Sequence, residues 1–163
     1  MHATDFSTGT PETRTRVLLV DDENLVRGAL YKVLERDGYE VLSASSGANA
    51  LVIWHQSSHP IDLLVTDYNM PDMTGLELAR ECCRLNPELR VLYISGSNPS
   101  EELRRDLEGP ARGFLTKPFR GDVLLRKVKE LLLTQTSIPP PWHSPETPVG
   151  RIRPAAMAKG VSH

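Results

Sequence analysis

The chain has 163 residues, of which 39% are hydrophobic and 25% are charged, and its formal net charge at pH 7 is -2. This composition is typical of a globular protein with room for one substantial domain, and the charge gives no reason to expect nucleic acid or an anionic membrane as a partner. No apolar run approaches the roughly 20 residues of a membrane span, and residues 1–12 lack the apolar core of a secretory signal. We therefore expect a cytoplasmic protein.

From its amino terminus, the chain opens with a segment rich in Thr, Ser, Pro and Gly, residues 1–14, which predicts a flexible leader. Short apolar runs then alternate with segments of helical spacing. The predicted strands are 17–20, 39–44, a run that begins at 63–65 and ends at Asp67, 90–94 and 113–116. The predicted helices run from Glu23 to a stop at Gly38, and over 47–55, 74–85, 100–107 and 121–133.

This alternation predicts an α/β fold, a doubly wound five-stranded parallel sheet with five helices, because each parallel crossover is right-handed and needs a helix. The predicted helix 100–107 has few apolar anchors, and we expect it to be the least firmly held. The composition changes near Ser137, where a proline run begins. We interpret 15–135 as the folded domain and 136–163 as a disordered, proline-rich tail.

Polar residues recur where the predicted strands end. Asp21 and Asp22 follow the first strand, Asp67 ends the third, Ser95 follows the fourth and Lys117 follows the fifth. Taken singly, Asp67 would only start a turn and Asp22 would only cap a helix. In an open parallel sheet, however, all five lie at the carboxyl edge, where ligands bind. Three carboxylates in one place require a cation, and an all-oxygen set suits Mg²⁺, beside which an aspartate can attack a phosphoryl group.

Four stretches in the right order carry a specific resemblance to a known family. They are 17–23 (VLLVDDE), 65–75 (VTDYNMPDMTG), 93–96 (YISG) and 113–119 (GFLTKPF). Together they resemble the receiver domains of bacterial two-component response regulators, over about residues 15–134. The resemblance implies a flavodoxin-like sheet with strand order 2-1-3-4-5.

The resemblance also implies roles for individual residues. Asp67 would be the phosphoacceptor, Asp22 a direct ligand of the Mg²⁺ cofactor and Asp21 a ligand through water, with the backbone carbonyl of Asn69 completing the metal site. As a phosphoprotein of this kind, the chain would carry its phosphate as an aspartyl phosphate.

Further roles concern the phosphoryl group and its consequences. Lys117 would pair with the phosphoryl group, and Ser95 would hydrogen-bond it. Ser95 and Phe114 would act as the switch, Phe114 turning inward when Ser95 moves towards the phosphate. The Lys117–Pro118 bond would be cis, which proline makes accessible.

By this resemblance the protein is a phosphorylation-activated signalling switch of a phosphorelay. It would receive the phosphoryl group from a sensor histidine kinase or a histidine phosphotransfer protein and act on a downstream protein through its fourth helix, fifth strand and fifth helix. We expect no DNA-binding domain, no membrane partner and no separate catalytic domain.

Other classes of protein fit the sequence less well. A flavodoxin-like nucleotide or flavin module needs a phosphate loop after the first strand, where this chain has acidic residues. A phosphatase with an aspartate nucleophile generally has a second acid two residues later, where this chain has Asn69. A receiver-like adaptor that works without phosphorylation would not need the full acidic set. Both a free single-domain regulator and the carboxyl-terminal receiver of a hybrid kinase remain open.

Overall fold

The computed structural model of the chain describes residues 13–134. Residues 1–12 of the predicted leader and the predicted tail 136–163 lie outside the described range. The strands are β1 (Arg16–Val20), β2 (Glu40–Ala44), β3 (Leu63–Asp67), β4 (Arg90–Ser95) and β5 (Arg112–Thr116). The helices are α1 (Asn24–Arg36), α2 (Gly47–Gln56), α3 (Gly75–Leu85), α4 (Glu101–Leu107) and α5 (Gly121–Leu133). None of the helices within residues 13–134 is long and apolar enough to cross a membrane.

The five strands form one sheet in the order β2-β1-β3-β4-β5, and every neighbouring pair is parallel. This confirms the parallel α/β fold that the alternating pattern predicts and the strand order that the family resemblance implies. The three inner strands, β1, β3 and β4, are buried almost throughout, which explains why their sequences are largely apolar runs rather than alternating ones. The predicted bounds differ by a residue or so: β2 begins at Glu40 instead of Tyr39, and β5 begins at Arg112 instead of Gly113.

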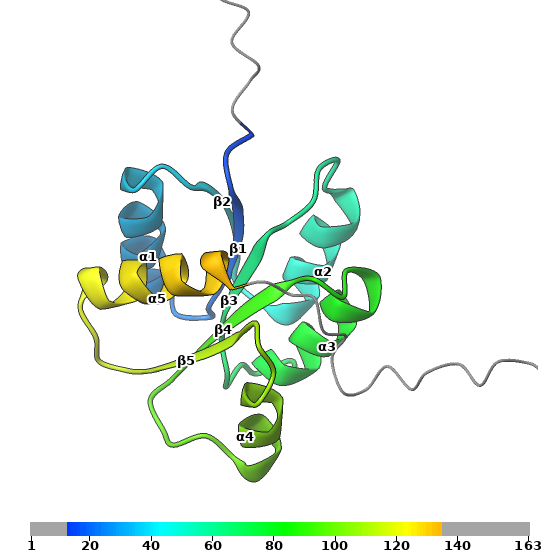
Figure 1. The fold of residues 1–163 in the computed structure, drawn as a ribbon, viewed down its shortest axis with the longest axis vertical. Coiled ribbons are helices and arrows are strands. Elements are labelled where there is room, and N and C mark those ends of the chain that lie inside the picture. The colour runs from blue at the N-terminus through cyan, green and yellow to red at the C-terminus, as the bar shows by residue number, and fades with distance from the viewer. Residues whose placement is uncertain (1–12, 135–163) are drawn as a thin grey trace, which may run out of the picture.

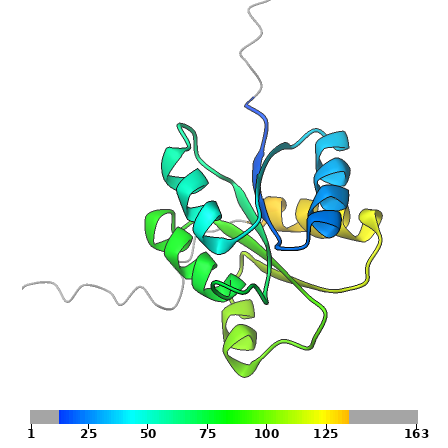
Figure 2. The ribbon, with the colours of Figure 1, turned by 180° about the vertical axis from the view of Figure 1, so that it is seen from behind.

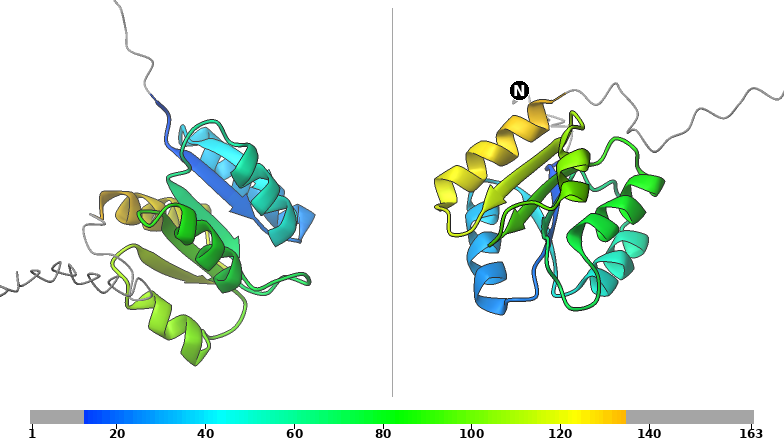
Figure 3. Two further views of the ribbon diagram at one scale, coloured as in Figure 1. Left: turned by 90° about the vertical axis from the view of Figure 1, so that its right-hand side faces the viewer. Right: turned by 90° about the horizontal axis from the view of Figure 1, so that it is seen from below.

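Helices cover both faces of the sheet, as Figures 1 and 2 show from opposite sides. Helices α1 and α5 lie together over one face and α2 and α3 over the other, and the two further views in Figure 3 show the sheet between them. Each face has its own apolar core: Leu34 and Val128 belong to one, Leu78 and Leu103 to the other. The sheet is thus held from both sides while its carboxyl edge is left to the connecting loops.

The loop from β3 into α3 is fixed by a capping box and by a close contact of glycine. The Thr74 side chain accepts a hydrogen bond from the Glu77 N–H at 3.2 Å, while the Thr74 N–H donates to the Glu77 carboxylate at 2.7 Å. The Gly75 N–H donates to the Tyr68 carbonyl at 2.8 Å. A Cβ at Gly75 would lie 2.4 Å from the Asp67 carbonyl oxygen. Only glycine therefore lets α3 begin directly beside the end of β3.

Candidate functional site: an acidic pocket at the carboxyl edge of the sheet

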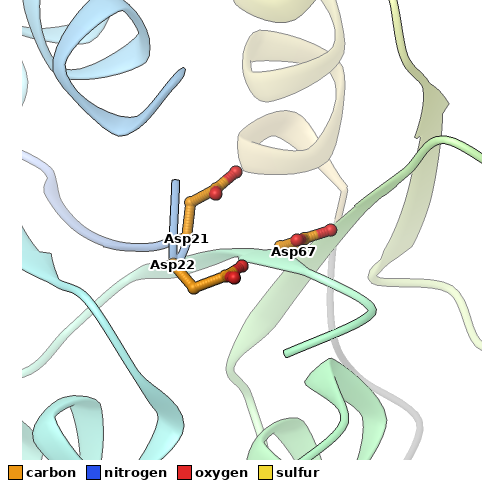
Figure 4. Close-up of side chains that lie close together, drawn as sticks. All are labelled: Asp21, Asp22 and Asp67. Atoms are coloured by element: carbon orange, nitrogen blue, oxygen red, sulfur yellow. The ribbon is translucent and has the colours of Figure 1, made fainter. Parts of the chain in front are cut away.

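Three aspartates from two neighbouring strands meet at the carboxyl edge of the sheet. Asp21 and Asp22 directly follow β1, and Asp67 is the last residue of β3, which pairs with β1. Figure 4 shows the three carboxylates gathered in one place, and one oxygen from each lies within 4.8 Å of the others. Asp21 and Asp67 are buried, whereas Asp22 is exposed to solvent. The structure thus brings together the three acids that the sequence singles out.

Lys117, at the end of β5, reaches across to these acids. Its Nζ lies 3.1 Å from Asp21 Oδ2, 3.8 Å from Asp67 Oδ1 and 3.9 Å from Glu23 Oε1. Burial by itself would lower the pKa of Lys117, but the hydrogen bond to Asp21 and the charges of Asp21, Asp67 and Glu23 outweigh it, so the pKa is raised. The lysine is therefore a fixed positive charge beside Asp67.

The environment of Asp67 makes its ionised form costly. The pKa of Asp67 is raised from 3.8 to about 6, chiefly by burial and then by the charges of Asp21 and Asp22, while Lys117 and the Asn69 backbone N–H act in the opposite direction. A cation placed among the three acids would relieve this cost. The electrostatics of the pocket therefore favour a bound divalent ion.

The Asp21 and Asp22 carboxylates differ in the number of hydrogen bonds that they accept from described residues. Asp21 Oδ1 accepts a hydrogen bond from the Glu23 N–H at 2.8 Å, and its Oδ2 accepts one from Lys117 at 3.1 Å. Asp22 has no hydrogen bond or ion pair with any other residue of the described range 13–134. An all-oxygen set with one uncommitted carboxylate and solvent access fits Mg²⁺, which retains waters in its coordination shell.

Ser95 lies on the other side of Asp67, at the end of the adjacent strand β4. The residue before it, Ile94, pairs with Asp67, and Ser95 itself is buried with only 1% of its surface exposed. Its Oγ accepts hydrogen bonds from the Asn69 side-chain amide at 3.4 Å and from the Ser97 N–H at 3.2 Å. The Ser95 hydroxyl is thus held at the end of β4, the strand next to the one that Asp67 ends.

The remaining predicted residue, Phe114, is placed further from the acids. Its half-buried side chain packs against the apolar core that includes Tyr93 and Leu103. The Lys117–Pro118 peptide bond is cis, as predicted, and the Lys117 N–H donates to the Ser95 carbonyl at 2.8 Å. The ends of β4 and β5 are therefore linked directly next to the pocket.

Sequence reasoning missed some residues that contact the acidic pocket or fix the loop after β3. Glu23 adds a further carboxylate near Lys117, and Arg27 Nη1 donates to the Asp21 carbonyl at 2.6 Å. Asp72, from the loop after β3, accepts hydrogen bonds from the N–H groups of Ala48 at 2.8 Å and Gly47 at 3.3 Å at the start of α2, and these bonds lower the pKa of Asp72. The helical spacing of the segment after Asp21 could have signalled the contact of Arg27 with Asp21. No local sequence pattern predicts that Asp72 bonds to α2, because that helix is distant in the chain.

Comparison with known proteins agrees with the fold and with this pocket. Residues 17–129 match the family described as the response regulator receiver domain, which is more than half of the chain. The sheet order and the acidic edge define the same class of fold. The chain belongs to the response regulator receiver family of two-component signalling proteins.

Individual relatives differ in how much of their length the chain covers. The chain is 38% identical over 120 residues to the sensor kinase CckA of Brucella abortus (strain 2308), covering 73% of this chain and only 13% of that protein. It is 35% identical over 123 residues to the response regulator receiver protein CpdR of the same organism, covering 72% of this chain and 97% of CpdR.

Two solved receiver structures also resemble the chain in fold and in sequence. A CheY-like receiver domain protein of Methanospirillum hungatei JF-1 gives a TM-score of 0.66 at 29% identity, covering 74% of this chain and 94% of that one. The response regulator TrrA of Thermotoga maritima, solved in complex with Mg²⁺ and BeF, gives a TM-score of 0.60 at 33% identity, covering 72% of this chain and 98% of that one.

Proposed function

We propose that the protein is a phosphorylation-activated switch of a two-component phosphorelay, in which Asp67 accepts a phosphoryl group from a histidine kinase or a histidine phosphotransfer protein. The observation that carries the proposal is the meeting of Asp21, Asp22 and Asp67 within 4.8 Å, with the Lys117 ammonium 3.8 Å from Asp67. Three acids can hold a cation, and this cation together with the fixed Lys117 ammonium would stabilise a negatively charged phosphoryl group during its transfer onto Asp67.

In the transfer, a carboxylate oxygen of Asp67 attacks the phosphorus of a phosphohistidine. A bond forms between this oxygen and phosphorus, the bond from phosphorus to the imidazole nitrogen breaks, and that nitrogen takes up a proton. Lys117 and the Ser95 hydroxyl lie beside Asp67 and would bind the oxygens of the transferred group. Bound Mg²⁺ would neutralise negative charge on these oxygens.

The metal would be held by Asp22 directly, by Asp21 through water, by Asp67 and by the backbone carbonyl of Asn69. The different engagement of the two neighbouring acids supports this division, because both oxygens of Asp21 already accept hydrogen bonds and those of Asp22 do not accept any from residues 13–134. Asn69 and Ser97 flank the pocket as uncharged groups, so neither provides a strong base for the hydrolysis of the acyl phosphate.

The signal would leave the pocket through Ser95 and Phe114. Ser95 would move towards the phosphoryl group and Phe114 would turn into the space released, which alters the surface of α4, β5 and α5 that a downstream protein contacts. The link between the ends of β4 and β5, through the Lys117 N–H and the Ser95 carbonyl, supports coupled movement of these elements.

The setting in the cell is part of the same proposal. CpdR is covered over almost its whole length, which supports a receiver that acts as a single-domain regulator. Such a regulator would act through partner proteins in the cytoplasm. The match to 13% of the sensor kinase CckA supports the second setting, a receiver module of a hybrid kinase. In either setting the receiver assists its own phosphorylation and dephosphorylation.

Intact-mass spectrometry after incubation with Mg²⁺ and acetyl phosphate tests the proposal. We expect one added phosphoryl group on the wild-type chain, lost with EDTA and in Asp67→Asn. Asp122→Asn, which changes an exposed acid on α5, is the matched control and should retain the adduct. An unchanged adduct in Asp67→Asn would refute the assignment of the acceptor. No adduct with several phosphodonors would favour an adaptor that works without phosphorylation.

A further inference from the structure

The loop between β3 and α3 carries the Asn69 backbone carbonyl, which the proposed metal site uses as a ligand. The first residue of this loop, Tyr68, is held on two sides: its N–H donates to the Ile94 carbonyl and its carbonyl accepts from the Gly75 N–H, both at 2.8 Å. Asn69 itself is exposed to solvent. The position of its carbonyl therefore also depends on what holds the rest of the loop, residues 70–74.

Asp72 connects this loop to α2, a helix that supplies none of the three acids. Its carboxylate accepts hydrogen bonds from the Ala48 N–H at 2.8 Å and the Gly47 N–H at 3.3 Å, in the first turn of α2. A negative charge is favourable there, because the free N–H groups at the amino end of a helix carry partial positive charge. The Met73 side chain lies against Gly47, where a Cβ would collide with it. Two consecutive loop residues thus contact the start of one helix.

Helix α2 is a firm support for the loop, because it is capped and packed independently of Asp72. The Ser46 side chain accepts a hydrogen bond from the Asn49 N–H at 3.1 Å, which caps the helix from its own segment. Ala50, one turn into the helix, is fully buried in the apolar core on this face of the sheet. Loss of the Asp72 carboxylate should therefore release the loop from α2 and leave the helix in place.

We propose that Asp72 is a positioning residue for the metal site: by holding the β3–α3 loop on the start of α2, it fixes the Asn69 carbonyl for Mg²⁺. This inference rests on the proposed function, since it concerns a ligand named there. The two residues between Asn69 and Asp72 transmit the constraint. Met70 is buried, and the ring of Pro71 restricts its backbone, so the connection is short and stiff.

Coupling between the metal site and the contact with α2 acts in both directions. If Asp72 favours the loop conformation that binds Mg²⁺, bound Mg²⁺ favours the contact of Asp72 with α2. The Gly47 and Ala48 amides, which donate to Asp72, should therefore exchange their hydrogens more slowly when Mg²⁺ is bound. This response lies in α2, apart from the ligands, so it measures the coupling without any phosphorylation.

Isothermal titration of the full-length chain with Mg²⁺ tests the proposal, with Ser46→Ala as the matched control for Asp72→Ala. Each substitution removes a side-chain acceptor from the first turn of α2, but only Asp72→Ala also frees the loop. Groups that orient metal ligands typically contribute about 10–100-fold to affinity, and Asp72 acts on one ligand through two residues, so we expect a weakening on the order of threefold to tenfold. Ser46→Ala should bind Mg²⁺ as tightly as the wild type.

Asp72→Asn separates the hydrogen bonds of Asp72 from its charge. The amide oxygen can still accept from the Ala48 N–H, so the Mg²⁺ affinity should lie between those of the wild type and Asp72→Ala. An affinity as weak as that of Asp72→Ala would attribute the effect to the charge alone and overturn the positioning role. If Asp72→Ala does not fold, hydrogen exchange in Asp72→Asn decides instead: the Ala48 amide should still respond to Mg²⁺, and no response would refute the proposal.

The outcomes for the wild type separate this inference from the proposed function. If the wild-type chain binds no Mg²⁺, both are wrong. If it binds Mg²⁺ but Asp72→Ala and Ser46→Ala have equal affinities, the metal site stands and the role of Asp72 is refuted. The same conclusion follows if the Gly47 and Ala48 amides of the wild type exchange equally fast with and without Mg²⁺.

Discussion

Asp67 carries its charge at a cost to the folded state. Its carboxylate is buried, the two neighbouring acids repel it, and only Lys117 and one backbone N–H favour ionisation, so its pKa is raised to about 6. An acid with a raised pKa binds more protons in the folded chain than in the unfolded chain. The same features that prepare the residue for a cation therefore destabilise the metal-free protein at neutral pH.

A comparison of the wild type with Asp67→Asn in EDTA measures this cost. The pKa of Asp67 is 3.8 in the unfolded chain and about 6 in the folded one. The contribution of the protonated Asp67 carboxyl group to the free energy of unfolding is therefore fully present below pH 3.8 and is lost as the pH rises from 3.8 to 6. We expect Asp67→Asn to be more stable by about 1–2 kcal/mol at pH 7 and to lose this advantage near pH 4. Urea unfolding across this range measures the difference, and a difference independent of pH would contradict it.

Gly75 places a steric limit on the same site. A Cβ at this position would lie 2.4 Å from the Asp67 carbonyl oxygen and 3.0 Å from Thr66 Cγ2, and neither the backbone nor the buried threonine has room to move. We expect Gly75→Ala to lower the free energy of unfolding by about 1–3 kcal/mol and to slow phosphorylation by displacing Asp67.

Gly28→Ala is the matched control, because Gly28 lies in the exposed part of α1 and an added methyl group would meet no atom within 4 Å. This change should stabilise the protein by up to about 1 kcal/mol through helix propensity. Urea denaturation of both variants provides the measurement. Equal effects of the two substitutions would show that the contact with Asp67 is relieved without cost.

At the scale of single elements, α4 is held by a buried polar network instead of by a broad apolar face. Tyr93 Oη donates to Asp106 Oδ2 at 2.7 Å, and Arg112 Nε donates to the same oxygen at 3.1 Å. The side chains of Arg112 and Asp106 are 5% and 4% exposed. Burial, with Asp106 beside it, raises the pKa of Tyr93, which therefore remains a hydrogen-bond donor. One carboxylate thus connects α4 to β4 and β5.

Removing this carboxylate should release α4. We expect Asp106→Ala to cost about 3–5 kcal/mol, because it leaves the Arg112 charge and the Tyr93 hydroxyl buried without their shared acceptor. The exposed ion pair between Glu101 and Arg105 on the same helix, at 3.5 Å, supplies the control: Glu101→Ala should change stability by less than about 0.5 kcal/mol. Thermal unfolding compares the two, and similar losses would argue against a special role for the network.

The same network shows where sequence reasoning reaches its limit. The succession of strands along the chain and the positions of Asp21, Asp67, Ser95 and Lys117 at strand ends are predictable, because periodicity and the ends of apolar runs are local signals. The order of the strands within the sheet comes from the family resemblance instead. The pattern of α4 predicts a weakly held helix, since only its few apolar residues are visible in it. Asp106 on α4 is buried because it pairs with Tyr93 of β4 and Arg112 of β5. A pairing between separate elements leaves no recognisable pattern in a short stretch of sequence.

Over the whole molecule, the acidic pocket joins three strands. Asp22 follows β1, Asp67 ends β3 and Lys117 follows β5, so the site exists only when these strands are assembled in one parallel sheet. An ion that needs this arrangement binds the folded chain and not the unfolded one. Its binding free energy is therefore added to the stability of the whole domain.

Titration with Mg²⁺ should accordingly raise the thermal unfolding midpoint. At a concentration 100 times the dissociation constant, a single site adds about 2.7 kcal/mol. Asp22→Asn should reduce the dependence on Mg²⁺ while slightly stabilising the metal-free protein, because it removes both a ligand and a repulsive charge near Asp67. Asp122→Asn on α5 should leave the wild-type dependence unchanged. If Asp22→Asn and the wild type respond equally to Mg²⁺, the ion is bound elsewhere on the protein, and the proposed metal site would have to be abandoned.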